Sequence, residues 1–233
     1  MASETPVQAA PSVTVTNHGQ ENQPVVVIDD FLATPERLVD DACAQVFTRI
    51  GPYYPGLRAP APAACLAGVS ALLEAILRDV FGMHSGAALV ECNYSLVTTP
   101  PEQLQPIQRL PHFDTTDPGR IALLHYLGRP EQGGTRFFRH RATGFETITA
   151  ERFGRYRDTL HEEAERGGLP PARYFGSESG QFEEIAHHEA AFNRAIIYRG
   201  MTLHSGAIPD GFACLSDPRQ GRLTVNTFFQ AGS

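Results

Sequence analysis

The second half of the chain limits the possible folds most strongly, because from about residue 87 it reads as short strand-like runs separated by turns. We expect strands near 87–98, 110–115, 120–127, 134–140, 182–188, 194–204 and 222–229. Pro130 and the Gly133-Gly134 pair provide turn residues, and a charged run over 149–166 predicts one inserted helix. Such a series is typical of an antiparallel jelly roll.

One strand and two helices are predicted before this series. The run PVVVIDDF over 24–31 reads as a short buried strand. Thr34 followed by Pro35 is typical of a helix start, and apolar residues then recur at helical spacing up to residue 50. A second apolar face over 66–80 predicts another helix, after a Pro- and Gly-rich loop over 51–64.

We therefore expect one folded domain behind a mobile tail. Residues 1–22 are polar and rich in Pro, Gln, Thr and Asn, as flexible termini often are. The single domain then covers 23–233, with a helical brace over 34–82 and a jelly roll over 87–230 that carries a helical insertion over 149–176. The predicted fold class is mainly β with bracing helices.

Composition narrows the classes of function. Hydrophobic residues make up 42% of the chain, which is enough for a sizeable core. The net charge of −7 and the lack of a long basic run argue against general nucleic-acid binding. The four cysteines form no C-x-x-C pair, which argues against a zinc ribbon. With no secretory-type leader and no long apolar run, we expect a cytoplasmic protein away from the membrane.

The segment PHFDT over 111–115 is the first candidate for chemistry. On a β-strand, His112 and Asp114 would point to the same face, because they are two residues apart. Two histidines and one carboxylate with open positions are the ligand set of non-haem Fe(II) oxygenases. H-x-D alone is short enough to arise by chance, so a strand-end histidine beside a surface aspartate explains it equally well.

Two later segments add polar residues at strand positions. The stretch YRGMTLHSG runs from a predicted strand into His204 and a Ser-Gly turn. In GRLTVNTFFQ, Arg222, Thr224 and Asn226 alternate with other residues and share one strand face. An arginine that faces a barrel interior is suited to a bidentate grip on a carboxylate. Taken singly, these are also explained by a loop-edge histidine and a solvated strand face.

Together, H-x-D, a distant histidine and an arginine opening the last strand resemble the Fe(II)/2-oxoglutarate dioxygenase superfamily. HYLGRPEQGGTRFF over 125–138 resembles a strand-turn-strand of prolyl 4-hydroxylase-like members, and RLTVNTFFQAG resembles the last strand of AlkB-like members. The resemblance covers residues 87–230, and the helices near 35–81 resemble the bracing helices of that group. It implies a double-stranded β-helix, a jelly roll with a cupin-like barrel.

The resemblance also implies roles for particular residues. The metal ligands would be His112, Asp114 and His204. The residues beside 2-oxoglutarate would be Arg222, Thr224, Asn226, Tyr94 and Asn93. Three other arginines are candidates for binding a substrate, with a salt bridge or a surface position as the alternative for each: Arg58, Arg136 and Arg199.

The implied activity uses Fe(II), 2-oxoglutarate and O₂, releases succinate and CO₂, and hydroxylates an unactivated C–H bond. Its substrate would be a small molecule, an amino acid or a peptidyl residue, and the protein a monomer or homodimer. One alternative is a cupin-like binding module without turnover, because a fold does not fix a function. Another is an oxygenase of nucleic-acid bases, against which the acidic charge argues.

Overall fold

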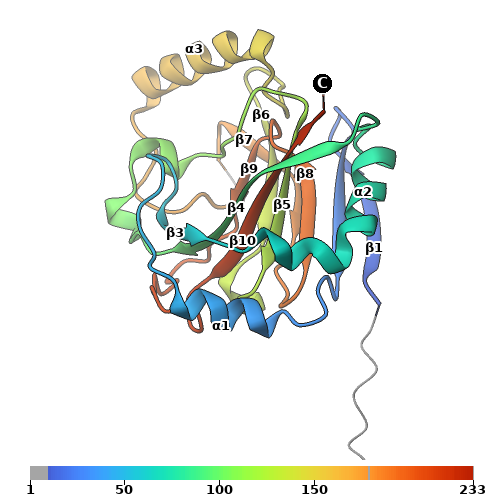
Figure 1. Ribbon diagram of the computed structural model, residues 1–233. Coiled ribbons are helices and arrows are strands. Elements are labelled where there is room, and N and C mark those ends of the chain that lie inside the picture. The colour runs from blue at the N-terminus through green and yellow to red at the C-terminus, as the bar shows by residue number, and fades with distance from the viewer. Residues whose placement is uncertain (1–9, 178, 233) are drawn as a thin grey trace, which may run out of the picture.

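The computed structural model describes residues 10–177 and 179–232, which form ten strands and three α-helices (Figure 1). The strands are β1 (Ser12–His18), β2 (Gln23–Asp29), β3 (Gly56–Pro60), β4 (Ala87–Val97), β5 (Arg120–Tyr126), β6 (Thr135–His140), β7 (Phe182–His188), β8 (Ala195–Arg199), β9 (His204–Gly206) and β10 (Leu223–Ala231). The α-helices are α1 (Glu36–Ala44), α2 (Ser70–Asp79) and α3 (Ala150–Gly167). Short 3-10 helices are η1 (Ala63–Val69), η2 (Pro101–Gln103), η3 (Pro106–Arg109) and η4 (Pro130–Gln132).

The strands form two sheets. The larger sheet has the order β1-β2-β8-β5-β10-β4-β3, and the smaller one has the order β7-β6-β9. The strand pairs within both sheets are antiparallel. This confirms the predicted class of mainly antiparallel β with a few helices. Within the described residues, no pairing of named strands joins the two sheets into a closed barrel.

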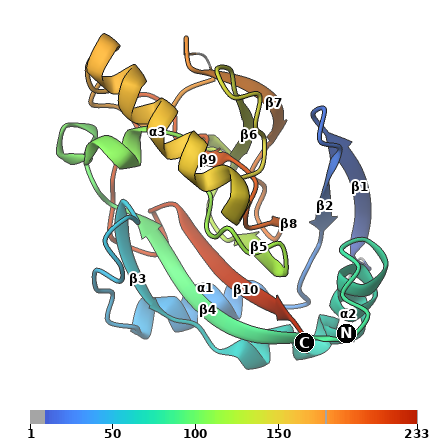
Figure 2. The same ribbon diagram turned by 90° about the horizontal axis from the view of Figure 1, so that it is seen from above.

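The helices α1 and α2 lie on one side of the larger sheet, and the smaller sheet lies on the other (Figure 2). A hydrophobic core joins the two helices to the sheet through buried side chains, which include Leu38, Ala42, Leu73, Ile76, Ile28, Leu96, Ile197 and Val225. A second core fills the space between the sheets and includes Tyr126, Phe137, Ile196 and Tyr198. Each central strand of the larger sheet therefore has apolar residues on both faces.

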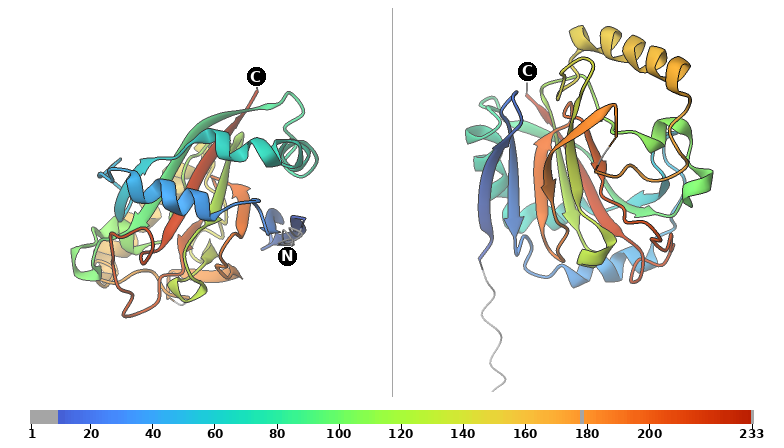
Figure 3. Two further views of the ribbon diagram at one scale, coloured as in Figure 1. Left: turned by 60° about the horizontal axis from the view of Figure 1, so that its bottom comes forward. Right: turned by 180° about the vertical axis from the view of Figure 1, so that it is seen from behind.

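Helix α3 follows β6 as the predicted insertion and covers the outer side of the smaller sheet (Figures 2 and 3). Its Tyr156 packs in a third core with Phe138, Ile148, Phe182 and Leu203. The predicted helix over 149–166 thus differs by one residue at each end from α3. No helix in the described part of the chain is long and apolar enough to cross a membrane.

Several predicted boundaries were wrong because local pairing overrides periodicity. Helix α1 ends at Ala44 rather than at residue 50, since Gln45 is extended and Thr48 forms a β-bridge with Arg58. The loop predicted over 51–64 contains β3, which pairs with β4. The second helix begins as the 3-10 helix η1 before it becomes α2. The strand predicted over 194–204 breaks into β8 and β9 around a turn at Gly200.

The prediction of a mobile tail over 1–22 was also wrong for residues 12–22; residues 1–9 lie outside the described residues. Residues 12–18 form β1, which pairs with β2 at the edge of the larger sheet (Figure 3). The strand is polar because it is an edge strand with most side chains in solvent. Its following turn is fixed by the Glu146 carboxylate, which accepts hydrogen bonds from the Gln20 and Glu21 amides.

Candidate metal centre

The segment that carries His112 and Asp114 is held by the turn before β9 rather than by a sheet. It was predicted as a strand over 110–115, but it forms one isolated bridge, between His112 and His204. The two residues exchange backbone hydrogen bonds of 2.8 Å in both directions. The Asp114 amide donates to the Gly200 carbonyl at 2.7 Å. These bonds fix the backbones of all three predicted ligands relative to one another.

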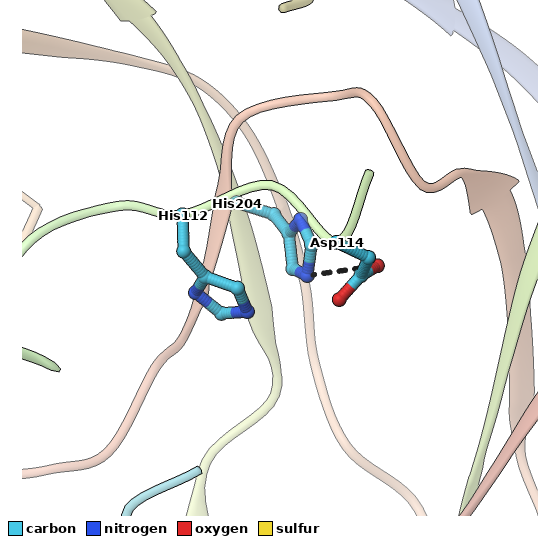
Figure 4. A group of neighbouring side chains, drawn as sticks. All are labelled: His112, Asp114 and His204. Atoms are coloured by element: carbon cyan, nitrogen blue, oxygen red, sulfur yellow. Dashed lines mark ion pairs between the residues drawn. The ribbon is translucent and has the colours of Figure 1, made fainter. Parts of the chain in front are cut away.

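The side chains of His112, Asp114 and His204 gather at one point (Figure 4). Their candidate ligand atoms all lie within 4.8 Å of one another, and His204 Nε2 is 3.8 Å from Asp114 Oδ2. The two imidazole centroids are 4.3 Å apart. His204 is buried, whereas the residues His112 and Asp114 reach solvent, although only 21% of the Asp114 side chain is exposed. The group is therefore accessible from one side.

This donor set fits a divalent transition metal. Neighbouring ligand atoms on a six-coordinate ion lie about 3 Å apart, so a small inward movement would complete the site. His204 Nδ1 must carry a proton, because it donates to the Thr202 carbonyl at 2.8 Å. That bond leaves the Nε2 lone pair for a metal and orients the ring. Two imidazoles and one carboxylate leave positions open, as iron oxygenases require.

The surroundings keep the histidine ligand neutral. Desolvation by the surrounding protein lowers the pKa of His112 well below its usual value, and the nearby charges of His204 and Arg58 lower it further. The same desolvation raises the pKa of Asp114, while His204 and Arg58 act in the opposite direction. A neutral imidazole has the lone pair that a metal needs. A bound cation would in turn favour the ionised carboxylate of Asp114.

Arg222 lies directly before β10 on the inner side of the larger sheet. Its buried guanidinium donates from Nε to the Gly133 carbonyl at 3.1 Å and from Nη2 to the Gly134 carbonyl at 2.9 Å. A Cβ built on Gly206, two residues beyond His204, would lie 3.8 Å from Nη2. Burial and the charge of Asp114 raise the pKa of Tyr198, whereas Arg222 lowers it. Arg222 and the triad therefore face the same space between the two sheets.

The other residues predicted beside the co-substrate divide between two faces. Thr224 and Asn226 follow Arg222 on the inner face of β10, and Thr224 Oγ1 donates to Asn226 Oδ1 at 2.9 Å. Asn93 lies directly opposite Asn226 and shares that face. The structure corrects the prediction for Tyr94, which points into the helix-side core and donates to Asp41 at 2.8 Å. Neighbouring residues of a strand face opposite ways.

The three arginines predicted to bind substrate also project from different faces of the sheets. Arg58 on β3 lies on the side of the triad, and its charge lowers the pKa of His112 and of Asp114. Arg136 points out of the smaller sheet and pairs with Glu184 at 3.3 Å. Arg199 faces the helix side, where its Nη2 donates to the Phe81 carbonyl at 3.1 Å. Arg136 and Arg199 therefore project away from the space between the sheets, where the triad lies.

Sequence reasoning missed aromatic and hydroxyl residues around the centre. The ring of Tyr198 lies 4.8 Å from that of His204, and both pack against Phe137. Tyr54 and the fully buried Ser95 lie on the side of Arg58. The alternation within AIIYR could have placed Tyr198 on the inner face of its strand. Tyr54 precedes β3 in a loop, and no periodicity marks it.

Gly133 should be required for the anchoring of Arg222. Its φ is +88°, and an added Cβ would meet the Ala207 carbonyl oxygen at 1.9 Å. We expect Gly133→Ala to cost at least about 2 kcal/mol, seen as a lower melting temperature. Gly144→Ala is the matched control, because Gly144 has φ +75° and no atom within 4 Å of the added Cβ. Equal losses in both variants would contradict the steric explanation.

Comparison with solved structures shows a shared fold at low sequence identity. HygX from Streptomyces hygroscopicus, solved with nickel and 2-oxoglutarate bound, has a TM-score of 0.53 and 14% identity over 90% of this chain and 84% of its own. The epimerase SnoN in complex with Fe³⁺, alpha ketoglutarate and nogalamycin RO has a TM-score of 0.50 and 15% identity over 90% and 80%. The chain therefore has the fold of these non-haem 2-oxoglutarate-binding proteins.

The sequence itself relates the chain to one family. No curated protein is significantly similar to it. A family model described as a family of unknown function, DUF6445, matches residues 9–229. That match includes the triad, Arg222 and every strand of both sheets except the last residues of β10. The chain belongs to this family, DUF6445.

Proposed function

We propose that this protein is a non-haem Fe(II)/2-oxoglutarate-dependent oxygenase that hydroxylates an unactivated C–H bond. The observation that carries the proposal is the convergence of His112, Asp114 and His204 from distant parts of the chain within 4.8 Å. Arg222, buried and on the same interior, adds a cation suited to a dicarboxylate. A binding module without turnover has no need of three metal donors and an arginine at one place.

The roles of the residues follow from their chemistry. His112, Asp114 and His204 would hold the iron and leave the remaining positions for 2-oxoglutarate and O₂. The iron with these co-substrates supplies C–H oxidation with release of succinate and CO₂. Arg222 would bind the distal carboxylate of 2-oxoglutarate, because its Nη1 has no hydrogen-bond partner among the described residues. Thr224 and Asn226 would add hydrogen bonds on the same strand face.

The fold agrees with this proposal. HygX and SnoN hold 2-oxoglutarate within the architecture that this chain shares. We take the two sheets as the two halves of a double-stranded β-helix, with the metal centre between them. The substrate would be a small molecule, an amino acid or a peptidyl residue, and the net charge of −7 speaks against a nucleic acid.

Anaerobic protein with Fe(II) and 2-oxoglutarate should show the weak visible metal-to-ligand charge-transfer band. Arg222→Gln should keep Fe(II) affinity but weaken 2-oxoglutarate binding by about tenfold or more, because a charged hydrogen-bond partner is lost. Arg219→Gln is the matched control: this exposed arginine pairs with Asp40 at the surface. Fe(II) and 2-oxoglutarate that both fail to bind by calorimetry would contradict the oxygenase and favour a cupin-like binding module.

A further inference from the structure

A second arginine, Arg58, faces the interior that contains the metal centre. In the larger sheet Arg58 lies directly opposite Ser95, Ser95 opposite Thr224, and Thr224 opposite Tyr126. Residues directly opposite one another in antiparallel strands project from the same face. Tyr126 belongs to the core between the sheets, so this whole row faces the smaller sheet. The Arg58 side chain therefore projects into the space between the two sheets, from the edge of the larger sheet that β3 forms.

The polar groups at this edge are incompletely hydrogen-bonded within the described residues. The Arg58 guanidinium lies over the ring of Tyr54, 4.3 Å from its centroid. Arg58 Nε is buried and has no hydrogen-bond partner in the described residues. The buried Ser95 hydroxyl lies beside Tyr54, and its hydrogen bond to that tyrosine lowers the pKa of Tyr54. A buried donor without a partner is costly and is usually satisfied by a ligand or water. Stacking on Tyr54 explains the position of the guanidinium but not the unsatisfied Nε.

Arg58 on β3 and Arg222, directly before β10, both lie near Tyr54. Desolvation raises the pKa of Tyr54, and the charges of Arg222 and Arg58 both lower it. Arg58 also acts on Asp114 and His112. In the described residues neither arginine forms a salt bridge with a carboxylate. The space between the sheets thus holds two guanidinium groups that no acidic residue in the described part of the chain pairs with.

The charges at the centre do not balance with 2-oxoglutarate alone. A divalent metal and two guanidinium groups outweigh the Asp114 carboxylate by three positive charges. The dianion of 2-oxoglutarate would neutralise two of these, which leaves one positive charge beside Tyr54 and Ser95. A desolvated charge of this kind is stable when an opposite charge is bound next to it.

We propose that Arg58 binds an anionic group of the substrate, a carboxylate, with Ser95 as a second donor and Tyr54 as the platform that orients the guanidinium. The substrate class is thereby narrowed to organic acids whose reacting C–H bond lies near the carboxylate-binding arginine. This inference rests on the proposed function, which supplies the metal and the first dianion. Arg222 would hold 2-oxoglutarate, and Arg58 would set substrate specificity.

The test uses the full chain loaded anaerobically with Fe(II) and 2-oxoglutarate. The probes are matched pairs, N-acetyl amino acids and their primary amides, titrated by calorimetry. We expect wild type to bind at least one acid about tenfold more tightly than its amide, since only the acid makes a charged bond to Arg58. Arg58→Gln should lose this preference and keep its 2-oxoglutarate affinity within about twofold. Arg58→Lys, which keeps the charge without the planar fork, should keep part of the preference.

Arg49→Gln is the control, because it removes the same charge from an exposed arginine close to the bridge between Thr48 and Arg58. A preference that persists in Arg58→Gln, or is absent in wild type, would overturn the proposal. So would a tenfold or larger loss of 2-oxoglutarate affinity in Arg58→Gln, roughly the effect of losing a charged hydrogen bond, because Arg58 would then hold the co-substrate. Wild type that binds no 2-oxoglutarate would contradict the proposed function instead, since the two affinities are measured separately.

Discussion

His204→Ala should abolish Fe(II) binding and, with it, 2-oxoglutarate-dependent succinate formation. His204 is the buried member of the triad, and its Nδ1 bond to the Thr202 carbonyl points Nε2 toward Asp114. Removal of partners outside the ligand shell already costs about 10- to 100-fold in metal affinity, so loss of one of three ligands should cost more than about 100-fold. Titration of the apoprotein with Fe(II), followed by the charge-transfer band, measures the loss.

The control for this variant is His84→Ala, because His84 is exposed and lies outside the site. It should bind Fe(II) like wild type. Asp114→Asn should also weaken the metal strongly, since the amide keeps the shape of the carboxylate and removes its charge. Unchanged Fe(II) affinity in His204→Ala, in a variant that melts normally, would remove His204 from the ligand set and leave the triad as a coincidence of packing.

The residue types of the triad could be read from the sequence, but their meeting could not be derived from spacing alone. Asp114 and His204 are ninety positions apart, with α3 between them. The structure brings them together because the backbone of residues 112–114 bonds to the turn at 200–204. A strand over 110–115 would place His112 and Asp114 on one face, and the two side chains do lie together. The segment is not a strand, however, and one isolated bridge to His204 holds it in place. Their role as metal ligands stays a prediction.

Errors in the wider site come from strand register. Asn93 and Tyr94 are neighbours, yet only Asn93 shares the face of Asn226, and a shift of one residue exchanges the two faces. The same rule separates Arg58 from Arg199, which both lie on strands of the larger sheet but project from opposite faces. The chemistry of a side chain can suggest a candidate site residue. The face of the sheet from which that side chain projects depends on pairing with strands that are far away in the sequence.

The N-terminal segment shows a different limit. Residues 12–18 carry the alternation of an edge strand, but five of the seven are exposed, and its valines, Val13 and Val15, are among them, so the strand buries no apolar face. Pairing with the adjacent strand β2 holds the segment, together with polar contacts that are distant in sequence. Glu146 binds the turn that follows β1, and Glu21 of that turn accepts a hydrogen bond from the Glu146 amide at 3.1 Å. Composition cannot reveal that two acidic residues, Glu21 and Glu146, each accept a hydrogen bond from the backbone amide of the other.

We expect Glu146→Ala to be the most destabilising single substitution considered for this chain. The carboxylate is fully buried and accepts hydrogen bonds from Arg139 Nε at 2.7 Å and from the Gln20 and Glu21 amides at 2.9 Å each. Alanine leaves Arg139 with Glu183 as its remaining acidic partner and both amides unpaired. Breaking a buried ion pair from one side costs about 3–5 kcal/mol, which lowers the melting temperature by roughly 6–20 °C at this size.

In Glu146→Ala the loss of structure should begin at the turn after β1, before the whole protein unfolds. Gly19 packs so closely on Glu146 that a Cβ there would overlap its carboxylate, so the turn at 19–22 and the carboxylate form one contact. Hydrogen exchange in Glu146→Ala should therefore accelerate first at the Gln20 and Glu21 amides, while the triad stays protected. Glu74→Ala, at an exposed position of α2, should leave both melting and exchange unchanged. If Glu146→Ala melts like Glu74→Ala, the turn is held by β1–β2 pairing alone, and the two acids contribute nothing to the stability of this edge of the larger sheet.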